Sequence, residues 1–467
     1  VTIISLITIA ALTRYLGISG YGDYTTIFAY VSFWAVFADF GFFWVLVREV
    51  SKPDVDQQKI FNNILTLKII SGLAVFLICS LVGFLIPQYS WTLKLGIAIV
   101  SAGWFWMSLN STYVGLFQSR LEMYKSVISE IVGRAIILAG VLVLVNLHYG
   151  LQSIFAVYIL GNFANFLLSY IFGSQNIKFS PRFDISLWKY ILKESFPLAI
   201  ITFIGLVHFK IDTVILSLFK GSVDVGIYGV PFKILEIIIL IPAMFIGNVF
   251  PILTKYFHAH DERLSQAIQK SFDFLVILGF PIVAGLITLS QPIIKLIAGQ
   301  DYITISTVTI RGIDFAAPRV LEILWISGGL TFLLTVFSNL LTVIGKQQKQ
   351  VMPMFVVTVF NIIANILIIP KYSYVGSAVI NVLTELAMLI WWSIITKKYL
   401  GFNISLKIVP KVVIVTLIMT ASLFLLRGIN VILISLIGAV IYGVASYLLK
   451  IVDKETLLKI MPSSLRK

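Results

Sequence analysis

The sequence is poor in the residues that build disulfides, metal centres and nucleotide sites. It contains one cysteine and four histidines among 467 residues. The single Cys79 excludes an intramolecular disulfide. His258 and His260 lie two residues apart in a polar stretch, a pattern typical of solvated loops, so we predict no metal site. A G-x4-G-K-[ST] phosphate loop is also absent, because Gly345-Lys346 lacks the upstream glycine. We therefore expect no ATP hydrolysis.

Charged residues are scarce as well, at 12% of the sequence, whereas hydrophobic residues make up 59% and the mean hydropathy is +1.00. Apolar runs of about twenty residues recur along the chain, each long enough to cross ~30 Å of hydrocarbon as a helix. The ten-residue alternating runs of barrel strands are absent. The composition predicts an all-α polytopic membrane protein and excludes a set of soluble domains.

The apolar runs predict about fourteen transmembrane helices. We place them at 1–13, 24–47, 60–86, 93–118, 126–147, 151–172, 196–219, 226–250, 271–297, 320–343, 351–369, 374–396, 408–426 and 430–449. The first run is short, about 20 Å as a helix, and the chain starts at Val1 without methionine. We expect further residues before it.

Basic residues are distributed unevenly between the two sides of these spans. The even-numbered connections and the C-terminal tail hold 23 lysines and arginines, and the odd-numbered connections hold seven. Since basic loops stay on the cytoplasmic side, we expect a multi-pass protein of the plasma or inner membrane with both termini in the cytoplasm. The net charge of +14 is spread over these short loops, where it meets anionic headgroups, so we expect no nucleic-acid partner.

The sequence contains an internal repeat. Gly17-x4-Gly22-x-Tyr24 follows the first span, and Gly221-x4-Gly226-x-Tyr228 follows the seventh, 204 residues later. Glycines suit tight turns and tyrosines suit the headgroup interface. We infer two parallel six-helix repeats plus two C-terminal helices. The predicted parts are an N-terminal lobe at 1–172, a cytoplasmic linker at 173–195, a C-terminal lobe at 196–396, two extra helices at 397–449 and a cytoplasmic tail at 450–467.

Several ionisable residues lie inside the spans, where each isolated charge costs at least ~2.5–3.5 kcal/mol. Lys210, Asp212, Lys233 and Glu236 lie in two of the most apolar stretches. Such residues line watery paths or bind charged ligands. Two opposite charges on one helix can also neutralise each other. Lys233 and Glu236 can do so because they are spaced i,i+3. Lys210 and Asp212 cannot pair directly, because at i,i+2 they lie on nearly opposite sides of a helix.

A series of short motifs runs along nearly the whole chain. They are Arg14-Tyr15-Leu16-Gly17, Tyr21-Gly22-Asp23-Tyr24, Asp39-Phe40-Gly41, Arg48-Glu49, Asp212, Gly226-Ile227-Tyr228, Phe250-Pro251-Ile252-Leu253, Gly299-Gln300-Asp301-Tyr302, Asn361 to Asn365, Pro370 and Gly376-Ser377-Ala378. In their order and spacing, these motifs resemble the polysaccharide flippases of the multidrug/oligosaccharidyl-lipid/polysaccharide (MOP) exporter superfamily. The resemblance implies a flippase, not an enzyme, that moves a polyprenyl-pyrophosphate-linked oligosaccharide outward. It implies a glycan polymerase or glycosyltransferases as pathway partners.

A pyrophosphate cargo requires fixed cations. The candidates for substrate binding are Lys210, Lys233, Lys68 and Arg134, and those for ion coupling or charge pairing are Asp39, Asp212, Glu236 and Glu130. Arg134 can instead pair with Glu130 at i,i+4. We expect no cofactor beyond H⁺ or Na⁺ as a coupling ion, with Asp39 preferred over Glu322 and Glu385.

Two other functions remain open from the sequence. An exporter of small cationic molecules from the same superfamily would favour acidic and aromatic residues in its site, and the basic Lys210 and Lys233 argue against it. A polysaccharide polymerase or ligase would need catalytic groups in a large outer loop. The longest outer segment, 298–319, contains Arg311, Asp314 and Arg319 but no histidine.

Overall fold

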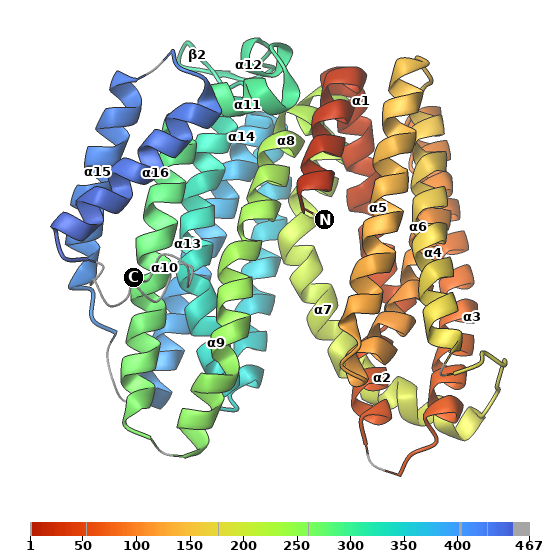
Figure 1. Cartoon of the computed structure of the whole chain (residues 1–467). Coiled ribbons are helices and arrows are strands. Elements are labelled where there is room, and N and C mark those ends of the chain that lie inside the picture. The colour runs from red at the N-terminus through yellow and green to blue at the C-terminus, as the bar shows by residue number, and fades with distance from the viewer. Residues whose placement is uncertain are drawn as a thin grey trace. The chain divides into compact units, whose positions relative to one another are not determined.

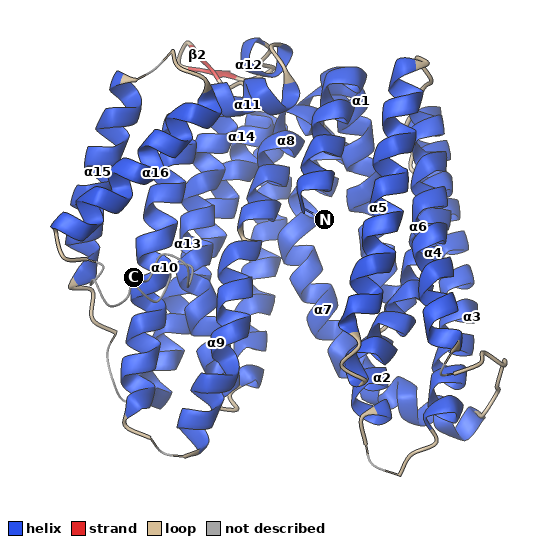
Figure 2. Ribbon diagram, in the orientation of Figure 1, coloured by secondary structure: helices blue, strands red, loops and turns tan. Residues whose placement is uncertain are grey.

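A computed structural model describes residues 2–52, 54–175, 177–259, 261–400, 404–426 and 428–451 (Figure 1). The tail predicted at 450–467 lies mostly outside the described residues. Within them, helices dominate the chain (Figure 2). The helices are α1 (Thr2–Asp39), α2 (Phe42–Val50), α3 (Gln57–Leu85), α4 (Trp91–Ser119), α5 (Met123–Asn146), α6 (Leu151–Ser174), α7 (Ile185–Phe219), α8 (Ser222–Ile238), α9 (Leu240–His258), α10 (Arg263–Thr288), α11 (Ser290–Ala298), α12 (Asp301–Thr304), α13 (Ala317–Val343), α14 (Val351–Leu400), α15 (Ile408–Leu425) and α16 (Val431–Leu448).

Strand structure in the described residues is confined to one short hairpin. Its strands β1 (Thr309–Ile310) and β2 (Ile313–Asp314) pair antiparallel, with Thr309 opposite Asp314. The hairpin lies in the connection between α12 and α13, and a short 3₁₀ helix, Gln347–Gln350, precedes α14. The polytopic all-α prediction is therefore confirmed.

Twelve stretches of helix in the described part of the chain are long and apolar enough to cross a membrane. Two of them contain a residue with non-helical backbone angles: Gly17 in α1 (φ 65°) and Ser373 in α14 (φ 48°). Each is a junction between two helices, at the place where a turn between spans is predicted. Dividing the helices there gives the fourteen predicted spans.

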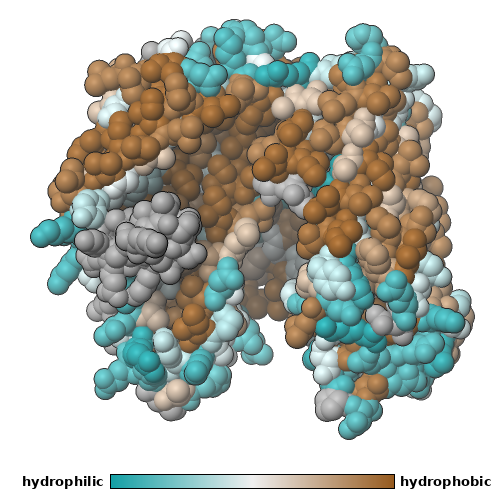
Figure 3. Space-filling view, viewed as in Figure 1, coloured by the Kyte–Doolittle hydropathy of each residue, from teal (hydrophilic) through white to brown (hydrophobic). Residues whose placement is uncertain are grey.

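Apolar side chains cover the outer surfaces of the helices. Leu77 and Leu81 on α3, for example, each expose 64% of their surface. On the face shown in Figure 3, hydrophobic residues cover the middle of the helices and hydrophilic residues gather at their ends. This distribution suits helices surrounded by lipid, whose polar ends meet water.

The chain divides into two compact units. Unit 1 comprises Val1–Gly229 and Asn365–Tyr374, and unit 2 comprises Val230–Ala364 and Val375–Lys467. In unit 1, aromatic side chains such as Phe61, Tyr113 and Phe117 form a buried core between α2, α3, α4 and α7. In unit 2, a second core gathers α9, α10, α13 and α14 around residues including Phe332 and Leu340.

The segment that joins α6 to α7 is held on α3 by side chains that bind its backbone. The Asn63 Oδ1 accepts hydrogen bonds from the Asp184 N–H (2.9 Å) and the Trp188 indole (3.1 Å). The Thr66 hydroxyl accepts one from the Arg182 N–H (3.2 Å), and Lys59 forms an ion pair with Asp184 (2.8 Å). α7 starts at Ile185, within the predicted linker 173–195, because Asp184 caps the Leu187 N–H (3.1 Å).

We predict that protonation of Asp184 loosens this segment. The Lys59 ammonium, and next the Leu187 N–H, hold the pKa of Asp184 below its usual value of 3.8. A lowered pKa in the folded state means that the contact has full strength above pH 3.8 and is lost as the pH falls through the lower value. Asp184→Asn mimics the protonated state at pH 7.5, so trypsin should cleave after Arg182 faster, by a factor of about 2–5.

The matched control is Asp54→Asn, because Asp54 is exposed in the α2–α3 connection. Its cleavage rate at Arg182 should equal that of the wild type. In the wild type, hydrogen–deuterium exchange of 177–188, corrected for the intrinsic rate, should also rise below pH 3.8. If trypsin cleaves the Asp184→Asn variant and the wild type after Arg182 at equal rates, the Asp184 carboxylate does not tether this segment.

Candidate functional site

Asp39 lies at a backbone break that the segment Asp39-Phe40-Gly41 creates. α1 ends at Asp39, Phe40 and Gly41 both have positive φ (45° and 77°), and α2 starts at Phe42. Such angles cost energy for a side chain like that of Phe40. A Cβ on Gly41 would lie 3.0 Å from the Ser195 carbonyl oxygen on α7. The break therefore needs glycine, and it leaves Asp39 at a helix end facing α3 and α4.

Lys68 on α3 is the ion-pair partner of Asp39. Its side chain is fully buried, whereas that of Asp39 is 32% exposed. The ammonium also donates to the Ser108 carbonyl oxygen (3.1 Å) and to the Ser111 hydroxyl, which in turn donates to Asp39 (3.3 Å). The protein thus neutralises Lys68 internally, and Asp39 is the more exposed member of the pair.

Asp212 on α7 is buried against the beginning of α8. It is 2% exposed and accepts hydrogen bonds from the Tyr228 hydroxyl and from the Thr213 N–H (2.7 Å). Tyr228 is completely buried. Its hydroxyl satisfies a buried carboxylate, and the position of this tyrosine at the headgroup interface stays a prediction. Lys210 lies two residues before Asp212, half-buried, nine residues before the end of α7 and so about 14 Å from it.

Two further cations form pairs along their own helices, as their spacing predicts. Arg134 lies 3.6 Å from Glu130 on α5, and Lys233 lies 2.7 Å from Glu236 on α8. The Arg134 and Lys233 side chains nevertheless remain 42% and 41% exposed. Both members of the Arg134–Glu130 pair are exposed, and such pairs are weak, typically under ~1 kcal/mol, so a phosphate oxygen could replace that carboxylate at little cost. Glu236 is only 14% exposed, so the Lys233–Glu236 pair is held more firmly.

The structure distributes the predicted site residues over both units. Lys210, Lys68 and Arg134 belong to unit 1, and Lys233 belongs to unit 2. The binding of substrate by these four cations therefore stays a prediction.

Unit 2 contains a cluster of buried polar side chains on α13 and α14. Of its members, only Glu385 was identified from the sequence. Ser327 on α13 donates a hydrogen bond to the Asn381 side-chain oxygen on α14. Ser327, Asn381 and Thr384 are each at most 6% exposed, and Glu385 is 9% exposed. The i,i+4 spacing of Asn381 and Glu385 in an apolar run was the signal that could have identified them together.

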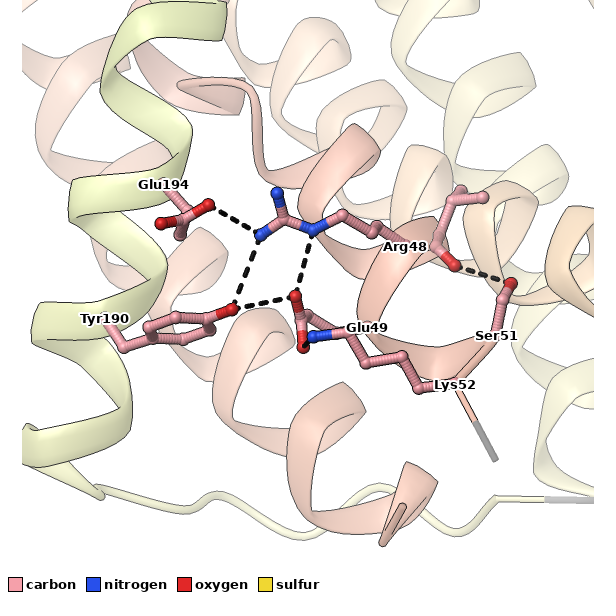
Figure 4. Close-up of polar contacts among 7 residues, drawn as sticks. Arg48, Glu49, Ser51, Lys52, Tyr190 and Glu194 are labelled. Carbon is pink, nitrogen blue, oxygen red and sulfur yellow. Dashed lines mark hydrogen bonds and ion pairs between the residues drawn. The ribbon is translucent and has the colours of Figure 1, made fainter. Parts of the chain in front are cut away.

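A charged cluster joins the ends of α2 and α7 in unit 1 (Figure 4). Arg48 contacts the carboxylates of Glu49 (3.0 Å) and Glu194 (2.9 Å). The Tyr190 hydroxyl donates to Glu49 (3.0 Å), and Lys52 also pairs with Glu49 (2.5 Å). Each member has at least one charged partner, so the cluster fastens α7 to α2 rather than presenting free charge.

The two copies of the glycine repeat pack directly on each other within unit 1. A Cβ on Gly22 would lie 1.7 Å from the Ser222 carbonyl oxygen and 3.0 Å from the Gly226 nitrogen. A Cβ on Gly226 would lie 2.0 Å from the Ile18 carbonyl oxygen. These contacts are reciprocal, because the 204-residue offset converts Ile18 and Gly22 into Ser222 and Gly226. A two-fold relation between repeats requires this reciprocity.

Side chains reinforce the same contact. Ser222 donates a hydrogen bond to Asp23, and Ser373, at the junction within α14, donates one to Asp224. Lys220 donates to the Pro370 carbonyl oxygen (3.0 Å). The turns of α1, α8 and α14 thus form one closely packed region in unit 1.

Two family profiles match the sequence. The profile described as polysaccharide biosynthesis protein matches residues 1–257, which is more than half of the chain, and the MatE profile matches residues 197–367. Among curated protein sequences, none matches this chain.

Several solved structures have a similar fold. The lipid II flippase MurJ in an inward closed conformation has a TM-score of 0.77 and 16% identity, with 96% of each chain covered. An inward-facing multidrug resistance MATE family transporter of the MOP superfamily has a TM-score of 0.67 and 13% identity, covering 85% of this chain and 94% of that one. A MOP superfamily transporter from Pyrococcus furiosus, whose binding pocket is described as having reverse polarity, has a TM-score of 0.51 and 12% identity, covering 86% and 95%.

Proposed function

Because the chain belongs to the polysaccharide biosynthesis protein family, with the fold of MOP-superfamily transporters, we propose that it flips a lipid-linked oligosaccharide across the cell membrane. The substrate is a glycan joined through pyrophosphate to a polyprenyl lipid, and it moves from the cytoplasmic to the outer leaflet by alternating access. The match of the family profile over residues 1–257 carries this proposal. The likeness to a lipid II flippase over 96% of both chains supports it.

The pyrophosphate is the part of this substrate that needs fixed cations, and the cations differ in what they can offer. The Lys210 side chain is partly exposed, and those of Lys233 and Arg134 are 41% and 42% exposed. We propose that they receive the phosphates, with Glu236 and Glu130 as resting partners of Lys233 and Arg134. Lys68 is enclosed, so its contribution is to hold Asp39.

The sequence contains no phosphate loop for ATP, so the energy for transport would come from an ion gradient or from consumption of the glycan outside. We propose Asp39 as the group that exchanges H⁺ or Na⁺. Its side chain is 32% exposed and already accepts from both Lys68 and Ser111. Binding of a cation at Asp39 would weaken its hold on Lys68, and this rearrangement would link ion entry to the packing of α1, α3 and α4.

We propose that both chain termini face the cytoplasm, as the distribution of basic loop residues favours. The glycan would then be released on the outer side. A glycan polymerase would act on it there, after glycosyltransferases have built it on the cytoplasmic side.

A second candidate function is export of small drug-like molecules, which the MatE profile match at 197–367 favours. The two candidates differ in the charge that their substrates require. Accessible lysines suit a pyrophosphate, whereas a cationic drug requires acidic groups. Removal of lysines should therefore impair glycan flipping and leave export of a cationic dye unchanged.

The test of the proposed function is the loss of two lysines. Lys210→Ala and Lys233→Ala should each reduce assembly of surface polysaccharide at least tenfold. Each removes a charge-assisted contact worth about 1.5–3 kcal/mol. Surface glycan is measured in cells that carry the variant as the only copy, and insertion is verified by the amount of protein in purified membranes.

The matched control is Lys411→Ala, because Lys411 is an exposed lysine near the start of α15 and lines no site proposed for this chain. Its loss should leave assembly near the wild-type level. Wild-type assembly in both the Lys210→Ala and the Lys233→Ala strains would exclude pyrophosphate binding by these lysines.

A further inference from the structure

Unit 2 contains a polar cavity that the proposed transport path does not use. Its volume is about 730 Å³, and α11, the α12–α13 connection, the start of α13 and the α15–α16 connection line it. That volume falls in the range of sites that hold small ligands. Six of the side chains that line it carry an amide or a charged group: Gln291, Lys295, Gln300, Asp314, Arg319 and Glu322.

Among the described residues of this lining, the charges balance. Lys295 and Arg319 supply two positive charges, and Asp314 and Glu322 supply two negative ones. An inorganic anion would meet the two carboxylates, and a metal cation would meet the ammonium and the guanidinium. The balance therefore favours a ligand that is neutral but rich in hydrogen-bonding groups.

The side chains also offer donors and acceptors together. The Ser290 hydroxyl donates to Glu322 Oε1 (2.7 Å), which fixes the carboxylate, and Oε2 has no hydrogen bond in the described part of the chain. The Arg319 guanidinium lies 6.0 Å from the centre of the Phe315 ring, and this contact leaves its N–H groups available. Gln291 and Gln300, both exposed, each add an acceptor and two donors.

Such a set matches sugar hydroxyls, because every hydroxyl group both donates and accepts a hydrogen bond. From these observations we propose that the cavity binds a neutral or N-acetylated pyranose of the glycan on the outer side of the membrane. This inference rests on the proposed function for the source of the sugar and on the orientation in which the α12–α13 connection is external. Occupancy of the cavity would hold the glycan after translocation and disfavour its return.

The experiment measures sugar binding without transport. Purified full-length protein in nanodiscs is mixed with lipid-free disaccharides of neutral hexoses and N-acetylhexosamines, and saturation-transfer NMR detects contact. At least one disaccharide should give a signal. Arg319→Ala and Glu322→Gln should reduce that signal at least fivefold, and Gln300→Ala should reduce it without disturbing a buried residue.

Arg311→Ala is the matched control, because Arg311 is an exposed arginine of the same connection and does not line the cavity. Its signal should equal that of the wild type, and thermal melting verifies that every variant is folded. The inference is overturned if no disaccharide binds, or if folded Arg319→Ala and Gln300→Ala bind as well as the control. If the wild-type protein binds a disaccharide but does not support glycan assembly in cells, the proposed transport function is refuted and the sugar site is not.

Discussion

Replacing Gly22 or Gly226 by valine is expected to destroy both stability and transport. The new Cβ would lie 1.7 Å from the Ser222 carbonyl oxygen in the first case and 2.0 Å from the Ile18 carbonyl oxygen in the second. Both obstacles are backbone atoms, so no side-chain rotation relieves the clash and the helices must separate. Overpacking of a core costs about 1–3 kcal/mol even where side chains can move. We expect at least the upper end of that range.

The measurements are the thermal unfolding temperature of the purified protein in detergent and the amount of surface polysaccharide in cells. Gly221→Val is the control within the same repeat, since a Cβ there meets no atom within 4 Å. It should melt like the wild type. Gly17→Val should lie in between, because Gly17 has open space but a φ of 65°. A Gly22→Val variant with wild-type melting would show that α1 and α8 do not approach this closely.

The large expected effect has a simple cause. Backbones this close bring many peptide groups into van der Waals contact through a narrow strip of small residues. The Ser222–Asp23 and Ser373–Asp224 hydrogen bonds join the same turns, so a valine in the strip would disturb apolar and polar contacts together.

The repeat illustrates how far sequence reasoning reaches. The spacing of the glycines predicted two related turns, and the reciprocal contact agrees with that relation. The spacing could not assign the roles of the glycines. Gly17 supplies a positive φ, Gly22 and Gly226 supply close approach, and Gly221 supplies neither. Those roles depend on which backbone lies opposite each glycine, and a single sequence does not contain that information.

The charged residues show the same division. The Arg134–Glu130 and Lys233–Glu236 pairs were predictable because both partners lie on one helix, where spacing fixes proximity. The Asp212–Tyr228 hydrogen bond joins two helices, so spacing gave no signal for it. The fourteen spans were predictable because apolar run length decides them. The start of α7 could not be predicted in this way, because its first turns carry polar residues and depend on the cap at Asp184.

Lys68→Met is expected to be the most damaging single substitution among the charged residues of unit 1. It removes a buried cation and leaves Asp39 with only the Ser111 hydroxyl among its partners described above. Breaking a buried ion pair by removing one member costs about 3–5 kcal/mol, because the remaining charge stays desolvated. Asp39 is 32% exposed, which places the expected cost at the lower end. Thermal melting in detergent measures it.

The double variant Asp39→Asn/Lys68→Met separates a structural role from a functional one. With both charges gone, the destabilisation should largely disappear, since a neutral replacement of a buried pair is often tolerated. If Asp39 exchanges the coupling ion, this folded double variant should still fail to assemble surface glycan. Recovery of both melting temperature and glycan would make the pair purely structural and exclude Asp39 as the coupling group. A Lys68→Met variant that melts like the wild type would contradict the buried pair itself. Lys411→Met, at an exposed lysine of α15, is the control for loss of a lysine.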